Sequence, residues 1–186
     1  MGDTRFNLFV LENGYQWLIG NVNFWESSFF YPFDKPIAFS DNLLGTLPVY
    51  ATFRSIGLDL YFSYQLWILT LFSLNFFLPY YAFKKFSKNV LTCSLAAYIF
   101  AFGLYNLNFI SHLQLLPRFL IPLIIYWFLD FLKTRDLYPL SKLAVGITFQ
   151  FYCGMYLGFI SFLALIPIGV SYLSLIHISE PTRQEA

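Results

Sequence analysis

Long apolar runs occupy most of the chain after Gly57 and predict helices that cross a membrane. Three of these runs cover residues 58–83, 90–110 and 115–132. The first contains a single charged residue, Asp59, and is long enough to cross about 30 Å of hydrocarbon. Pro79 is expected to kink or end this helix, because proline lacks the backbone donor that a helix interior needs.

A fourth apolar run, 143–172, is interrupted at Gly154. Its thirty residues exceed one span but fall short of two full spans, which need about 20 residues each. We therefore expect two short or re-entrant helices on either side of Gly154. The whole pattern predicts an all-α fold in which residues 58–172 form a polytopic transmembrane bundle of about four to five helices.

Basic residues follow the first and third predicted spans and predict the topology. They are Lys84, Lys85 and Lys88 after the first span, and Lys133, Arg135 and Lys142 after the third. The connection between the second and third spans carries only His112 and Arg118. Because basic residues concentrate on the cytoplasmic side, residues 1–57 and the His112 connection are predicted to share the outer face.

Residues 1–57 are less apolar and predict an outer loop with interfacial helices. In the stretch 4–19, Arg5, Glu12 and Gln16 fall on one stripe of a helix, which is too interrupted by charge to span a bilayer. The stretch 24–45 is crowded with aromatic residues and broken by prolines. The pair Ser40–Asp41 signals the start of a further helix, which Pro48 is expected to break or delay.

Composition supports a membrane protein and excludes some functions. The chain is 58% hydrophobic and 11% charged, with a mean hydropathy of +0.61, whereas a soluble domain has roughly a quarter charged residues. A net charge of +1 with no basic run gives no reason to expect nucleic-acid binding. Cys93 and Cys153 lie in apolar segments, and no ligand spacing demands a metal. A divalent metal stays possible, and no cofactor is required.

Acidic residues are concentrated before the first predicted span. Six of the ten lie before this span or at its start: Asp3, Glu12, Glu26, Asp34, Asp41 and Asp59. Acids near an aromatic membrane interface can have perturbed pKa values and act in catalysis, although most exposed acids are only solvated. Asp34 beside Lys35 predicts a turn, and Glu12 belongs to the polar stripe. Asp3, Glu26 and Asp41 are therefore the catalytic candidates.

Polar residues between the second and third spans are the candidates for substrate binding. One interpretation is a pocket for an anionic head group, in which Arg118 supplies the charge and His112 and Gln114 donate hydrogen bonds. The other is that Arg118 reaches to the interface and the amides satisfy helix ends. Gln150 and Tyr152, near Gly154, either line this pocket or flank a packing contact between small residues.

The C-terminal stretch 173–183, LSLIHISEPTR, is similar over its whole length to the conceptual translation of a transposase adapter used in preparing DNA sequencing libraries. We therefore expect residues 173–186 to be an assembly artefact, and the chain to be a fragment of a longer protein.

Four stretches resemble bacterial integral membrane proteins related to the GT-C superfamily, which are polytopic glycosyltransferases that use polyprenyl-phosphate-linked sugars. They are GDTRFNLFVLENGYQWL (2–18), FWESSFFYP (24–32), SDNLLGTLPVY (40–50) and HLQLLPRFLIPL (112–123). In that superfamily an essential acid follows a first membrane helix and opens a large outer loop. Asp3 matches that acid and residues 3–57 match the loop. The first helix has no counterpart in this chain, and we expect the fragment by itself to be inactive.

The resemblance implies transfer of a sugar from a polyprenyl-phosphate donor on the outer face of a bacterial inner membrane. Asp3 would accept the proton of the attacking hydroxyl, and Glu26 or Asp41 would stabilise an oxocarbenium-like transition state. Arg118 or Arg5, assisted by His112, would meet the charge of the leaving phosphate. The alternative is a non-enzymatic transporter or lipid-handling scaffold, for which no midplane charges or inverted repeats are evident.

Overall fold

The computed structural model describes residues 2–27, 29, 32–103 and 112–179. All regular structure in this part of the chain is helical, so the predicted all-α class is confirmed for it. The α-helices are α1 (Gly2–Leu18), α2 (Leu47–Ser55), α3 (Leu60–Phe83), α4 (Val90–Phe102), α6 (Ile121–Thr134), α7 (Leu137–Cys153) and α8 (Met155–Ser179). The short 3-10 helices are η1 (Pro36–Phe39) and η2 (Leu113–Leu115).

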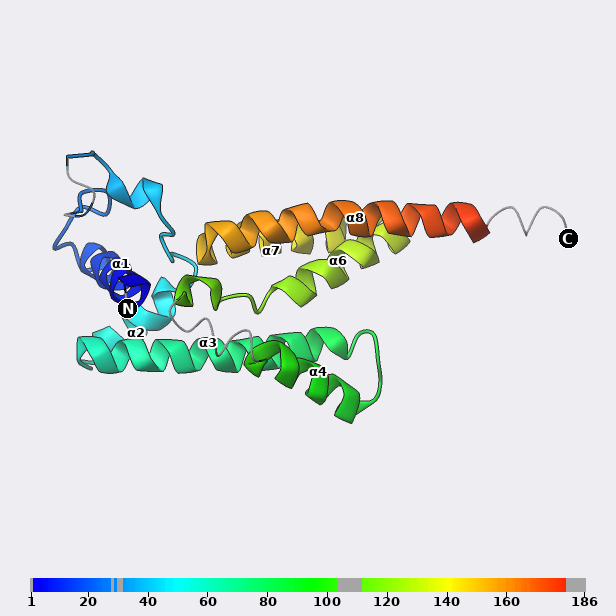
Figure 1. Ribbon diagram of the computed structural model, residues 1–186, viewed down its shortest axis with the longest axis horizontal. Coiled ribbons are helices and arrows are strands. Elements are labelled where there is room, and N and C mark those ends of the chain that lie inside the picture. Colours follow the sequence, from blue (N-terminus) through cyan, green and yellow to red (C-terminus); the bar gives the residue numbers. More distant parts are fainter. Residues whose placement is uncertain (1, 28, 30–31, 104–111, 180–186) are drawn as a thin grey trace, which may run out of the picture.

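The helices form two packed groups that α6 joins (Figure 1). α3 packs against α4, α7 packs against α8, and α6 contacts α3, α7 and α8. α1, α2 and η1 gather at one end of the long helices, called the site end below. The connections from α3 to α4 and from α6 to α7 lie at the opposite end, called the basic end. Lys85 and Lys142 line one cavity there, so the two predicted basic clusters share one end.

Two of the described helices are long and apolar enough, by length and composition, to cross a membrane. They are Leu60–Phe83 and, within α8, Met155–Leu175. Val90–Phe102 is apolar but shorter, and residues 104–110 of the predicted second span lie outside the described residues. The run 143–172 divides at Gly154 into two helices as expected, but α8 is not short: it has 25 residues and includes the candidate span Met155–Leu175, while α7 has 17 residues. α8 continues past Tyr172 to Ser179.

α1 is an amphipathic helix whose apolar face is buried. Val10 and Leu11 are 1% and 0% exposed, and they belong to a core that includes Leu47 and Tyr50 of α2 and Trp67 of α3. Burial of side chains of this size stabilises the packing by about 1.5–3 kcal/mol each. α1 is thereby fixed to the start of the long helix α3, which determines where its first turn and Asp3 lie.

Prolines lie at the start of α2 and in the interior of α3, and their effects on the two helices differ. α2 begins at Leu47, immediately before Pro48, so the expected delay is confirmed. Ser40 instead follows the 3-10 helix η1, and Asp41 does not begin α2. In α3, Asp59 caps the first turn through hydrogen bonds from the backbone of Tyr61 and Phe62 at 2.9 and 3.1 Å. The helix then continues through Pro79 to Phe83, so of the two expected effects, a kink or an end, proline does not cause the end.

The predicted third span begins later than the apolar pattern suggested. Its first residue, Leu115, ends η2, residues 116–120 belong to no helix, and α6 starts only at Ile121. Leu116 keeps helical backbone angles, with φ −71° and ψ −39°, but Pro117 has no backbone donor with which to continue a helix, while Pro122 suits the first turn of a new one. Hydropathy cannot detect this, because proline acts through the backbone and leaves the run apolar.

Buried amides from other helices bind the backbone of this non-helical segment. Asn75 of α3 donates from Nδ2 to the Leu116 carbonyl at 2.8 Å, and Gln150 of α7 donates from Nε2 to the Pro117 carbonyl at 2.7 Å. Both side chains are 0% exposed. A buried carbonyl without a partner costs about 1–3 kcal/mol. The two amides therefore make a proline-broken segment compatible with an apolar interior.

Replacing Asn75 by leucine tests this role, because leucine has a similar volume but no donor. We expect Asn75→Leu to lower the free energy of unfolding in detergent by about 1–2 kcal/mol. Ser73→Ala on the same helix is the control, since Ser73 is partly exposed and its hydroxyl donates to the Leu69 carbonyl within α3 at 2.9 Å. Equal unfolding midpoints for Asn75→Leu and Ser73→Ala would contradict the account.

Candidate functional site

Asp3 and His112 meet at the site end although 109 positions separate them. Oδ2 of Asp3, in the first turn of α1, lies 2.6 Å from Nδ1 of His112, which immediately precedes η2. Their side chains remain 46% and 43% exposed, so a substrate can reach both. The structure therefore brings together a predicted catalytic acid and a predicted substrate-binding residue.

Two amides complete this contact. Gln114 donates from Nε2 to Oδ2 of Asp3 at 3.3 Å, and it accepts on Oε1 from Nδ2 of Asn7 at 3.0 Å. Asn7 lies one helical turn after Asp3 and is 3% exposed. The hydrogen bonds from Gln114 and His112 lower the pKa of Asp3 below its usual value of 3.8. Asp3 is therefore an ionised carboxylate at neutral pH.

A carboxylate on one ring nitrogen gives a histidine a defined chemistry. It orients the ring, and a histidine held in this way by a carboxylate exchanges a proton through its other nitrogen, Nε2. Asp3 itself is a weak base, because its pKa is lowered and its Oδ2 already accepts two contacts. The geometry thus favours proton transfer at His112 with Asp3 as its partner.

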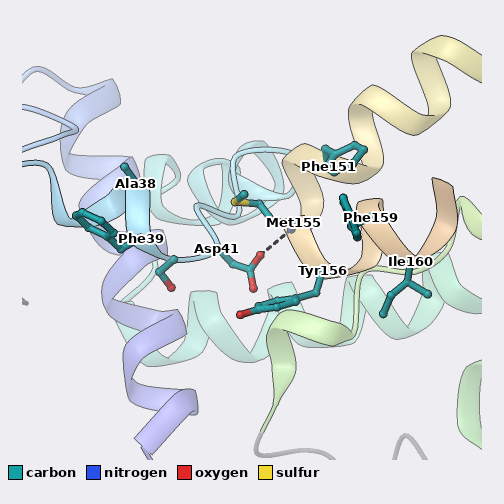
Figure 2. A pocket seen from close by; sticks show the side chains of 9 residues that line it. Ala38, Phe39, Asp41, Phe151, Met155, Tyr156, Phe159 and Ile160 are labelled. Carbon is teal, nitrogen blue, oxygen red and sulfur yellow. Dashed lines mark hydrogen bonds between the residues drawn. The ribbon is translucent and has the colours of Figure 1, made fainter. Parts of the chain in front are cut away.

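Asp41 occupies a different cavity at the site end (Figure 2). Its Oδ1 accepts a hydrogen bond from the backbone nitrogen of Met155, the first residue of α8, at 2.6 Å. The cavity has a volume of about 390 Å³ and is mainly apolar. Its lining consists of Ala38, Phe39, Ser40, Asp41, Phe151, Met155, Tyr156, Phe159 and Ile160. Burial raises the pKa of Asp41, and the hydrogen bond from Met155 opposes that rise.

The turn at Gly154 separates the Asp3 contact from the Asp41 cavity. A Cβ atom at Gly154 would lie 3.1 Å from the carbonyl oxygen of Gln114 and 4.0 Å from Oδ1 of Asp41. A side chain there would press on the carbonyl of the residue that bonds Asp3. Gly45 also lies against this turn, since its backbone nitrogen donates to the Tyr152 carbonyl at 2.7 Å. The two acids therefore flank one tightly packed turn without sharing a cavity.

Glu12 forms a partly buried cluster that the sequence interpretation missed. Arg54 of α2 binds it through Nε at 2.9 Å and Nη2 at 3.1 Å, and Tyr50 donates its hydroxyl at 2.7 Å. The side chain of Glu12 is only 18% exposed. Burial raises its pKa, but the hydrogen bonds from Arg54, Gln16 and Tyr50 outweigh burial and lower it below 4.5. The sequence signal that could have indicated this pair was the opposite charge of Glu12 and Arg54, which lie on two short amphipathic stretches.

Four other predicted site residues lie away from Asp3. Glu26 is exposed and accepts a hydrogen bond from Asn23 at 3.0 Å. Arg5 lines a separate groove with Glu12 and Tyr61. The Tyr152 side chain is 50% exposed. A fourth residue, Gln150, is buried and binds the Pro117 carbonyl.

Arg118 contacts α4. It donates from Nη2 to the Phe100 carbonyl at 2.8 Å, and its guanidinium lies 5.0 Å from the centre of the Phe100 ring. These contacts join the non-helical segment to α4. In the described residues, no group of three or more His, Cys, Asp or Glu side chains could hold a metal ion.

Comparisons with protein-family models, with curated proteins and with solved structures found no match to this chain. Functional assignment therefore starts from the geometry of the site.

The Glu12 cluster predicts a specific dependence of stability on pH. Because the folded pKa of Glu12 is lowered, its contribution is present above pH 4.5, the usual value, and is lost as the pH falls through the folded pKa. We expect Glu12→Gln to lower unfolding free energy at pH 7 by about 1–3 kcal/mol. The variant should also lose less stability on acidification. An unchanged acid dependence in denaturant titrations would contradict this.

The hydrogen bond that Asp41 accepts from Met155 predicts different stabilities for two substitutions of Asp41. Asparagine keeps an oxygen acceptor for Met155 and removes the cost of burying a charge, whereas alanine removes the acceptor. We expect Asp41→Asn to match the native chain at pH 7 within about 0.5 kcal/mol, and Asp41→Ala to be less stable by about 1 kcal/mol. Thermal unfolding in detergent measures both. Equal losses in the two variants would show that the hydrogen bond to α8 is unimportant.

Proposed function

We propose that the chain is part of an integral membrane glycosyltransferase that transfers a sugar from a polyprenyl-phosphate donor at its outer face. The observation that carries the proposal is the contact between Asp3 and His112 at the site end. The resemblance to the GT-C superfamily implies that Asp3 matches the essential acid of that superfamily. A carboxylate held against an accessible imidazole is what a proton transfer at that position requires.

Exposed apolar side chains support placement in a membrane. Only 28% of the apolar window of α3 and 22% of that of α8 is buried, whereas a helix in the core of a soluble protein is mostly buried. Large exposed side chains on α3, α4 and α8 include Leu69, Phe77, Leu91, Leu95, Ile99, Phe159, Ile160, Leu163 and Ile166. Exposing so much apolar surface to water costs free energy, whereas exposing it to lipid does not.

The charge distribution supports the proposed orientation. The two basic clusters lie at the basic end, and the Asp3–His112 contact lies at the opposite end. Because basic residues concentrate in the cytoplasm, the site end faces outward in this proposal. In a bacterium, this is the outer side of the inner membrane, where lipid-linked sugars are used by proteins of the superfamily that the sequence resembles.

The proposed reaction is a displacement at the anomeric carbon. The acceptor hydroxyl forms the new carbon–oxygen bond, and its proton passes to Nε2 of His112. The bond from the anomeric carbon to the phosphate oxygen breaks, and the lipid phosphate leaves with the electron pair. Asp3 stabilises the resulting imidazolium, whose positive charge lies beside the departing phosphate. Asp3 thus acts through His112 and is a positioning residue.

Asp41 is the second acid that this proposal can use. It lies across the Gly154 turn, in a cavity whose aromatic residues include Phe39, Phe151 and Tyr156. An ionised carboxylate near the site would stabilise positive charge on the sugar ring in the transition state. Glu26 is exposed and bonded locally to Asn23, so it has the weaker claim to this role.

The same cavity favours the alternative of a lipid-handling scaffold. A mainly apolar space of about 390 Å³ beside the exposed face of α8 suits an acyl or prenyl chain. Both functions need such a chain-binding surface. They differ in the need for proton transfer, because a scaffold would tolerate loss of the His112 imidazole.

Replacing His112 separates the two functions. In the full-length protein, we expect His112→Ala to reduce sugar transfer from a polyprenyl-phosphate donor by about 10²–10⁴-fold with donor binding retained, because general-base catalysis contributes that much. Asp34→Asn is the matched control, since Asp34 is an exposed acid in the same outer segment, and it should transfer at the native rate. Native transfer rates in His112→Ala would contradict the proposed role.

A further inference from the structure

A further cavity, more polar than that of Asp41, lies at the basic end, far from the Asp3–His112 contact. Its volume is about 210 Å³, and it is formed by the end of α3 with the connection that follows it, the middle of α6 and the start of α7. The lining residues are Tyr81, Lys85, Tyr126, Trp127, Asp130, Tyr138, Pro139 and Lys142. Two ammonium groups, three phenols and an indole thus meet at one small concavity.

We propose that this cavity binds the phosphate head group of an anionic phospholipid of the inner leaflet. The inference goes beyond the proposed sugar transfer. It uses the membrane placement of the helices but does not require the catalytic site.

The two lysines come from segments far apart in the chain, and both are held against aromatic rings. Lys85 Nζ lies 4.6 Å from the centre of the Tyr81 ring, and Lys142 Nζ lies 3.8 Å from the centre of the Tyr138 ring. These contacts limit the directions that the long side chains can take. Because both ammonium groups line the same cavity, they present two positive charges to one phosphate.

Asp130 is the one acid in the lining, and its position leaves the charge balance positive. Among the described residues, no ion pair joins Asp130 to Lys85 or Lys142. With one carboxylate and two ammonium groups, the cavity has a net charge of +1. Lys84, Lys88 and Lys133 add positive charge nearby. An anion is therefore attracted, and a cation is not.

The aromatic residues indicate a lipid head group rather than a soluble anion. Tyrosine and tryptophan concentrate where membrane helices meet the head-group layer. Tyr81 and Tyr138 are 54% and 69% exposed at this end. Basic pockets between membrane helices on the cytoplasmic side suit the head groups of anionic lipids. A phosphate attached to an acyl glycerol would place its chains along the exposed apolar surface of α3.

The test compares two double variants that remove equal charge. Lys85→Gln/Lys142→Gln removes both ammonium groups from the cavity, and Lys84→Gln/Lys88→Gln removes two lysines that do not line it. Binding of phosphatidylglycerol to the purified chain in neutral detergent is measured by native mass spectrometry. We expect the cavity variant to bind about thirtyfold more weakly than the native chain, and the control about as well as the native chain.

Three further outcomes keep the inference falsifiable. Asp130→Asn should bind phosphatidylglycerol more tightly, because it removes the opposing charge. Phosphatidylcholine should not distinguish the variants. Glycerol phosphate should bind far more weakly than the lipid. Equal losses in the two lysine double variants would show a diffuse surface attraction and overturn the site, and tight binding of glycerol phosphate would overturn the lipid as the ligand. Sugar transfer by the full-length protein is a separate readout, so its loss or retention does not bear on this result.

Discussion

The non-helical segment 116–120 is the constraint on which the rest of the structure depends. Pro117 prevents the chain from continuing a helix, and the segment is buried among apolar helices, so its carbonyls need partners from elsewhere. Asn75 and Gln150 supply them from α3 and α7, and Arg118 binds back to α4. Helices α3, α4 and α7 are thereby tied to the short segment that leads into α6, and each of these contacts lies in an otherwise apolar surrounding.

The same segment determines where the chemistry lies. Because residues 116–120 are anchored, η2 is fixed at the site end, and His112 lies against the first turn of α1. Gln114 connects this contact to Asn7. On the other side, its carbonyl oxygen would lie 3.1 Å from a Cβ atom at Gly154, which is tighter than an ordinary contact. The packing of the helices, the hydrogen bonds to the backbone of residues 116–120 and the position of the His112 ring therefore depend on one another.

Apolar run length was enough to predict the all-α class, α3 and the break at Gly154, because burial and span length depend on composition. The shared position of Asp3 and His112 at one end also followed from the alternation of basic connections. The start of α6 could not be predicted in this way, since Pro117 and Pro122 act through backbone geometry within an apolar run. The partners of Glu12 and Arg118 depend on packing between distant segments, which periodicity does not encode.

A double-mutant cycle on sugar transfer tests the central claim, that Asp3 acts through His112, most directly. The full-length protein is assayed as Asp3→Asn, as His112→Ala and as the combination of the two. Residues that act as one unit are not additive. The account predicts that the double variant is slower than His112→Ala by less than about threefold. A double variant whose loss equals the product of the two single losses would show that Asp3 and His112 work independently, which would contradict the account.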